Sequence, residues 1–351
     1  MPVLDSPVSN ARNKRPVFVV GCHRSGTNLL YDTLLSAGGF AIYRGYLPIH
    51  KMLVPRFGSL GNLENRRCII RVWLRSKGFR RSGLDAEALT SKLLAEGKTG
   101  GDFIRIVMNE IARQQNAVRW AVYDPDNVLY MRRIKTEIPN ALFIHIIRDG
   151  RDIALSLKKM GEFRPVPWNR EPASLETTAL YWQWMVKKGK EHGKLIPNDY
   201  AEIHYEELVR DPRHAMGMLS TFLDQDLDWD RVQAVSLGRV RESNSSFRGD
   251  TQKNQANPVN RWRENLSSAQ VADLEILVGD CLEESGYDLA TPPEQRKPRL
   301  RHRFLRWFYP SFLDFKGWLK IKTPAGRLTD LSALELSDSI TDESEQLTPT
   351  S

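Results

Sequence analysis

The stretch VFVVGCHRSGTNLLYDTLLSAGG, residues 17–39, constrains the fold more than any other part of the 351-residue chain. Its first four residues are apolar, which is typical of a buried strand, and its second half has the apolar periodicity of a helix. Two glycines between them have the G-x-x-x-x-G spacing of a loop that binds phosphates between a strand and a helix. The sequence therefore predicts a strand over 16–20, a loop over 21–27 and a helix over 28–37.

This loop lacks two residues of a nucleoside-triphosphate site. Such a site continues with lysine for the phosphates and then serine or threonine for Mg²⁺, whereas this chain has Thr27 and Asn28. The loop would still direct backbone N–H groups and a helix N-terminus at an anion. Arg24 adds a guanidinium group that can bridge two oxygens of one anionic group. We therefore expect an anion site that needs no metal ion.

Strands alternate with helices along most of the chain. Further strands are predicted in RWAVYDP, ALFIHII and YAEIHY, and Asp152 is expected to cap the helix that follows ALFIHII. Helices are expected near 127–137, 173–191, 206–224 and 267–285, with a helical region over 59–117. The pattern predicts an α/β fold with three layers, in which helices flank a central, mainly parallel sheet of the P-loop nucleotide-binding type. Ligands of such sheets bind at the carboxyl ends of the strands.

Composition predicts four segments. They are a flexible N-terminus over 1–15, the α/β domain over 16–290, a basic aromatic extension over 291–323 and an acidic, disordered tail over 324–351. The formal charge of +8 favours anionic partners. We see no secretory signal and no bilayer-length apolar run, and the three cysteines lack metal-site spacing. These features predict a soluble cytoplasmic protein.

Three segments of the sequence together resemble a known family. GCHRSGTNLL is similar to the 5′-phosphosulfate loop of sulfotransferases that use 3′-phosphoadenosine 5′-phosphosulfate (PAPS), and closest to the R-S-G-T type of bacterial and Golgi members. FIHIIRDGRDIALS resembles the 3′-phosphate motif, and IHYEELVRDP resembles a third segment whose tyrosine approaches the nucleotide. The likeness extends over about residues 16–287, in the family's order and spacing. It implies that PAPS is bound by Arg24, Ser25, Gly26, Thr27, Asn28, Arg148, Ser156 and Tyr205.

The sequence also departs from the family pattern. The usual proline before the loop arginine is His23, which either bends the loop differently or contacts the acceptor. The glycine-rich R-K-G motif near the C-terminus is absent, and Arg248 and Lys253 are candidates for its role.

The general base is not defined by the resemblance. We assign catalysis to Arg24, which would neutralise charge on the sulfuryl group, and to Asp124 as the base. Asp124 stands near the position of the family's catalytic histidine, but it could equally be an Asx-turn residue in YDPDN. His50 and Glu64 are the rival candidates, and no metal ligand is expected.

The resemblance implies an enzyme that moves a sulfuryl group from PAPS to an acceptor hydroxyl by metal-independent in-line transfer, with 3′,5′-ADP as product. The acceptor would be a carbohydrate, a lipid or a small metabolite. The alternatives are a P-loop kinase and a catalytically silent protein that binds nucleotides or polyanions. The missing lysine argues against the kinase.

Residues 296–322 carry nine Lys or Arg with many aromatic residues and a single acid, Asp314. This composition favours contact with an anionic membrane surface or an acidic polymer. The remaining alternative is a segment that packs on the domain with its basic stems exposed. A specific nucleic-acid partner is not expected.

Overall fold

The computed structural model describes residues 11–161, 173–241 and 258–337. Contacts divide the chain into two compact units, residues 1–40 with 118–318 and residues 41–117 with 319–351. The prediction from the sequence of one domain over 16–290 stays a prediction.

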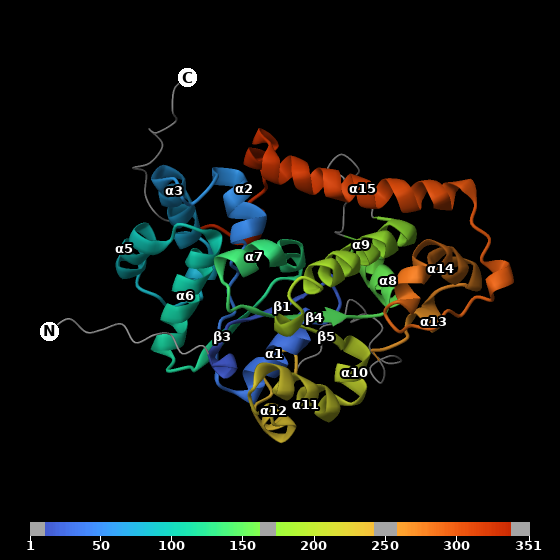
Figure 1. The fold of residues 1–351 in the computed structure, drawn as a ribbon, viewed down its shortest axis with the longest axis horizontal. Coiled ribbons are helices and arrows are strands. Elements are labelled where there is room, and N and C mark those ends of the chain that lie inside the picture. The colour runs from blue at the N-terminus through green and yellow to red at the C-terminus, as the bar shows by residue number, and fades with distance from the viewer. Residues whose placement is uncertain (1–10, 162–172, 242–257, 338–351) are drawn as a thin grey trace. The chain divides into compact units, whose positions relative to one another are not determined.

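The first unit contains the sheet and its flanking helices (Figure 1). Its strands are β1 (Val17–Gly21), β2 (Phe40–Ala41), β3 (Arg119–Tyr123), β4 (Leu142–Ile147) and β5 (Tyr200–His204). Its helices are α1 (Thr27–Ala37), α7 (Met131–Glu137), α8 (Gly150–Met160), α9 (Leu175–Gly193), α10 (Tyr205–Arg210), α11 (Pro212–Leu223), α12 (Trp229–Val235), α13 (Trp262–Asn265) and α14 (Ser268–Glu283). Helix α15 (Leu300–Lys322) begins in this unit. The strands expected from the sequence are confirmed.

The sheet has the strand order β2-β3-β1-β4-β5. Strand β1 pairs in parallel with both β3 and β4, and β4 pairs in parallel with β5. Helices α1, α10, α11 and α12 lie on one face, and α7, α8, α9 and α14 lie on the other (Figure 1). The predicted three-layer α/β fold with a mainly parallel sheet is confirmed.

Side chains of β1 alternate between the two layers. Val17 and Val19 belong to the core shared with α1, α10, α11 and α12, whereas Phe18 packs against Trp120 and Phe143 on the other side. All five residues of β1 are buried. The apolar run at the start of the sequence is therefore a central strand covered on both faces.

The second unit is helical. It consists of α2 (Val54–Phe57), α3 (Leu63–Leu74), α4 (Lys77–Arg80), α5 (Ala86–Glu96) and α6 (Gly100–Gln114), with a π-helical turn at Ile49–Leu53. Trp73 is buried at its centre, with edge-to-face contacts to Phe79 and Phe103.

Part of the predicted tail has defined structure. Residues 324–337 form 3₁₀ turns at Pro324–Leu328 and Ser332–Leu334, with Leu334 buried. Glu335 accepts a hydrogen bond from Lys77 at 2.6 Å. These residues are ordered in spite of their acidic composition. The Glu335 carboxylate is paired and the Leu334 side chain is buried. Residues 1–10 and 338–351 lie outside the described residues.

His145 in β4 is completely buried, and burial lowers its pKa from the usual 6.5 to about 3. Its Nδ1 lies 2.7 Å from the Tyr200 hydroxyl, which itself donates to Glu202. Because that hydroxyl hydrogen is already used, Nδ1 carries the proton and donates to Tyr200. Nε2 has no hydrogen-bond partner among the described residues, so the ring is held in its neutral form.

We predict that His145 makes the fold sensitive to acid. Between pH 3 and 6.5 the unfolded state binds a proton that the folded state does not. The free energy of unfolding therefore falls as the pH decreases through this range, by up to about 1.4 kcal/mol per pH unit. Urea unfolding should show a shallower pH dependence for His145→Gln, and His214→Gln, at an exposed histidine, is the matched control. Equal slopes in all three proteins would contradict the prediction.

Candidate functional site

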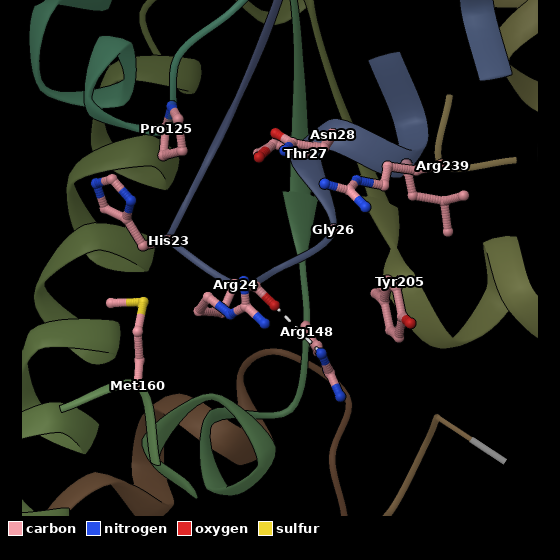
Figure 2. A pocket seen from close by; sticks show the side chains of 11 residues that line it. His23, Arg24, Gly26, Thr27, Asn28, Pro125, Arg148, Met160, Tyr205 and Arg239 are labelled. Atoms are coloured by element: carbon pink, nitrogen blue, oxygen red, sulfur yellow. Dashed lines mark hydrogen bonds between the residues drawn. The ribbon is translucent and has the colours of Figure 1, made fainter. Parts of the chain in front are cut away.

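A cavity of about 280 Å³ lies at the carboxyl ends of β1 and β4, within the first unit. The β1–α1 loop forms one wall, and Arg148, which directly follows β4, forms another. Tyr205 at the start of α10 and Arg239 after α12 complete the side opposite His23 (Figure 2). The site thus occupies the edge at which α/β sheets bind ligands.

The β1–α1 loop brings the N-terminus of a helix to this cavity. Gly26 precedes α1 with a φ of 98°, and no side chain caps the helix. A Cβ atom on Gly26 would lie 2.4 Å from the Tyr205 ring, so only glycine fits. Thr27 and Asn28, the first two residues of α1, line the cavity. An uncapped helix N-terminus of this kind favours a bound anion.

Three guanidinium groups line the cavity, those of Arg24, Arg148 and Arg239 (Figure 2). Burial lowers the pKa of Arg24, and the charges of Arg148 and Arg239 lower it further. Each of these effects opposes a positive charge, and a bound anion would offset them. Arg24 also has a left-handed φ of 72°, which is uncommon for a residue with a side chain.

Arg148 is held by backbone carbonyls. It donates to Pro258 O at 2.8 Å and to Arg24 O at 3.2 Å. Its guanidinium carbon lies 4.4 Å from the centre of the Tyr205 ring, a distance typical of a cation–π contact. Its Nε is buried and has no hydrogen-bond partner within the described ranges. The structure thus places Arg148 in contact with Tyr205, and the resemblance assigns both residues to the bound nucleotide.

The helix after β4 is capped by Asp149, not by the expected Asp152. Asp149 accepts a hydrogen bond from the Arg151 N–H at 2.9 Å. Asp152 lies in the first turn, where it accepts from the backbone N–H groups of Asn260 and Trp262. The prediction was wrong because this carboxylate holds a segment more than a hundred residues away.

Two predicted PAPS ligands, Ser156 and Ser25, do not line the cavity, whereas the other predicted ligands do. Ser156 is buried and accepts a hydrogen bond from Arg24 Nε at 3.0 Å. The Ser25 hydroxyl donates to the Cys22 carbonyl inside the loop. Neither residue is among those that line the cavity. Both side chains support the loop in this structure, and their contact with a nucleotide stays a prediction.

His23 and Asp126 form a pair at the opposite side of the cavity. His23 Nε2 lies 3.2 Å from Asp126 Oδ2. His23 lines the cavity together with Pro125 and Met160, whereas Asp126 is buried (Figure 2). An imidazole oriented by a buried carboxylate is an arrangement suited to proton transfer. Asp126 was not among the residues predicted from the sequence, although it lies only two residues after Asp124.

Asp124 has the turn geometry that was predicted as the alternative to a role as general base. It is buried and caps the 3₁₀ helix Pro125–Tyr130 by accepting from the Asp126 N–H at 3.1 Å. It is not among the cavity residues. Its role as a base stays a prediction.

The other candidates lie elsewhere in the chain. His50 is buried in the second unit, and Glu64 lies in the first turn of α3 there, with an ion pair to Arg67 at 2.6 Å. Arg248 and Lys253 lie outside the described residues, as does the segment 162–172. Arg239, which the sequence analysis missed, is positioned through its backbone N–H, which donates to Asp32 in α1. In the ranges that the structure describes, no group of three or more His, Cys, Asp or Glu side chains could hold a metal ion.

Comparisons with a family model and with solved structures found similar proteins. A family model described as the sulfotransferase family matches residues 16–231. The sulfotransferase domain of the Synechococcus PCC 7002 olefin synthase is similar in structure, with a TM-score of 0.50 and 17% identity over 78% of this chain and 95% of that domain. Sulfotransferase STF9 from Mycobacterium avium has a TM-score of 0.44 and 18% identity over 83% and 80% of the two chains. A comparison with curated protein sequences found no match.

The loop geometry generates a prediction about Gly26. Gly26→Ala should lower the free energy of unfolding by about 1–2 kcal/mol for the left-handed backbone alone, and by more because of the clash with Tyr205. Gly217→Ala in α11 is the matched control, because an added Cβ there meets nothing within 4 Å. That substitution should stabilise the helix by up to about 1 kcal/mol. Chemical unfolding measures both, and a Gly26→Ala protein as stable as the parent would refute the loop geometry.

Proposed function

This chain belongs to the sulfotransferase family, and we propose that it transfers a sulfuryl group from PAPS to an acceptor hydroxyl. The observation that supports this most is the convergence of three guanidinium groups on the uncapped N-terminus of α1. A donor with a 3′-phosphate and a 5′-phosphosulfate carries several negative charges at two separate places. The cavity offers cations and backbone donors to match them.

The residues present fit such a donor. Arg148 has a buried Nε without a hydrogen-bond partner in the described part of the chain, and an incoming phosphate oxygen would satisfy it. We assign Arg148, with Ser156 and Tyr205, to the 3′-phosphate. The backbone amides from Ser25 to Asn28 are assigned to the 5′-phosphate.

Arg24 and Arg239 are assigned to the transferring group. PAPS supplies an activated sulfuryl group, whose bond to the 5′-phosphate oxygen breaks as the acceptor oxygen bonds to sulfur. Positioned cations lower the energy of such a step when they face the oxygens on which charge develops. Arg24 is suited to this role because it lies in the β1–α1 loop and lines the cavity, where burial and the charges of Arg148 and Arg239 lower the pKa of its guanidinium group.

His23 is our candidate for the general base. Its Nε2–H would donate to Asp126, and Nδ1 would accept the proton of the acceptor hydroxyl. Asp126 would hold the ring in this tautomer and stabilise the imidazolium that forms, as buried carboxylates do for other catalytic histidines. We prefer this pair to Asp124 because His23 lines the cavity and Asp124 does not.

Two experiments with purified protein test the activity. Radiolabelled PAPS incubated with fractionated cell extract should transfer its label to an acceptor, and the protein should bind 3′,5′-ADP in the presence of EDTA. A P-loop kinase would instead bind ATP with Mg²⁺. Binding of 3′,5′-ADP without any transfer of label would identify a silent nucleotide-binding protein.

Variants at Arg148 and Arg24 should separate binding from chemistry. Arg148→Ala should weaken 3′,5′-ADP binding by about 10-fold to 100-fold, as expected for a lost charge-assisted hydrogen bond. Arg24→Ala should lower turnover by about 100-fold or more with a much smaller effect on that binding. Arg132→Ala, at an exposed arginine of α7, is the control. Equal losses of binding in both cavity variants would show that the two roles are wrongly assigned.

The base assignment has its own test. His23→Gln should reduce turnover by about 10²-fold to 10⁴-fold, while 3′,5′-ADP binding stays within a few-fold. Asp126→Asn should reduce turnover less, because it leaves the imidazole in place. Asp124→Asn should be close to the parent in turnover, since an amide can keep the turn. Normal turnover of His23→Gln together with an inactive Asp124→Asn would reassign the base to Asp124.

A further inference from the structure

Helix α15 carries a row of exposed aromatic side chains within the first unit. They are Phe304, Trp307, Phe308, Phe315 and Trp318, and we call them the aromatic face. Their exposed fractions range from 42% for Phe308 to 70% for Trp307. Large contiguous apolar patches are rare on monomeric proteins and mark sites of interaction.

The aromatic face points away from the helices of the first unit on which α15 packs. The buried residues of α15 are His302, Tyr309 and Leu313, and at 3.6 residues per turn they lie on the side of the helix opposite the aromatic face. His302 Nε2 lies 3.3 Å from Asp273 of α14, and Trp184 of α9 donates to Asp314 at 2.9 Å. These contacts fix the rotation of the helix about its axis.

Aromatic pairs give this surface an ordered form. The rings of Phe304 and Phe308 stack with centroids 5.2 Å apart, and those of Phe315 and Trp318 stack at 6.0 Å. Such pairs cover one another only in part. Their outer edges and the indole of Trp307 stay exposed, in the manner of side chains that enter the interface of a bilayer.

Positive charge surrounds the aromatic face. Residues 296–322 contain nine Lys or Arg and only one acid, Asp314. That carboxylate lies 3.1 Å from Lys188, so its charge is already compensated. Lys297, Arg299 and Arg303 are exposed next to the first aromatic residues.

No helix in the described ranges is long and apolar enough to cross a membrane.

We infer that α15 docks the protein on the surface of an anionic phospholipid membrane. The aromatic side chains would enter the boundary between headgroups and acyl chains, and the flanking cations would contact the lipid phosphates. This inference is independent of the proposed sulfuryl transfer, because it uses none of the cavity residues.

The same observations disfavour two other occupants. An acidic polymer would be bound by the cations and would leave five large aromatic side chains in water. A second copy of this chain, related by a two-fold axis, would bring two identical positively charged surfaces together. An anionic bilayer satisfies both the apolar and the charged parts of the surface at once.

Sedimentation of the full chain with vesicles tests the inference. It should pellet with vesicles of phosphatidylcholine mixed with phosphatidylglycerol, much less with phosphatidylcholine alone, and less as salt increases. Replacement of Trp307 and Trp318 by serine should weaken partitioning at least about tenfold per residue. Leu195→Ser is the matched control, because this leucine is 61% exposed outside α15.

Charge variants test the second half of the inference. Lys297→Gln with Arg303→Gln should weaken partitioning by about fivefold per charge, and Arg132→Gln with Lys194→Gln is the matched pair elsewhere on the first unit. Circular dichroism should show that all variants fold, since the replaced side chains are exposed.

Three outcomes would overturn the inference. One is equal pelleting with neutral and anionic vesicles, and another is binding of an acidic polysaccharide without any vesicle binding. The third is a dimer that the tryptophan variant converts to a monomer, again with no binding to vesicles, which would show that a second copy covers the aromatic face.

Discussion

The parallel pairing of β1 with β4 is the constraint on which the rest of the site depends. In this register Gly21 lies opposite Ile146, so the chain leaves both strands at the same edge of the sheet. The loop after β1 carries Arg24 and the residue after β4 is Arg148. Two cations that are 124 residues apart in the sequence are thereby joined through the hydrogen bond from Arg148 to the Arg24 carbonyl. The sheet, which the apolar pattern specifies, is what places the two charges together.

Bringing guanidinium groups together is unfavourable, and the structure shows how that cost is offset. Arg148 donates to backbone carbonyls and lies over an aromatic ring, and Arg24 donates to Ser156. These contacts orient the two groups, and the Asp152 carboxylate lies 3.4 Å from Arg148. Burial lowers the pKa of Arg24, and the charges of Arg148 and Arg239 lower it further. An anion bound in such a cavity would offset the burial of these groups and the repulsion between them. Preorganised charge of this kind is the main means by which enzymes stabilise a transition state.

The two proposals concern different surfaces of the first unit, and together they bear on the acceptor. A membrane-docked sulfotransferase would meet hydroxyl groups at a lipid–water interface more often than those of dilute metabolites. Among the three acceptor classes, this combination favours lipids and the carbohydrates attached to them. The cavity alone indicates no such preference, because most of the residues that line it are assigned to the donor in our proposal.

The sequence by itself determined those features that short-range patterns encode. Apolar periodicity and the glycine spacing placed Arg24 in a loop before a helix, Arg148 after a strand and Tyr205 at a helix start. The pairing of His23 with Asp126, the third cation and the outward rotation of α15 were decided only by the tertiary structure. Each depends on contacts between segments distant in the chain, such as the hydrogen bond from the Arg239 N–H to a carboxylate in α1. Local propensity carries no information about which distant backbone N–H group will donate a hydrogen bond to a given carboxylate. For the same reason Asp124 could be recognised as a turn residue or a base from sequence, but not assigned to one of them.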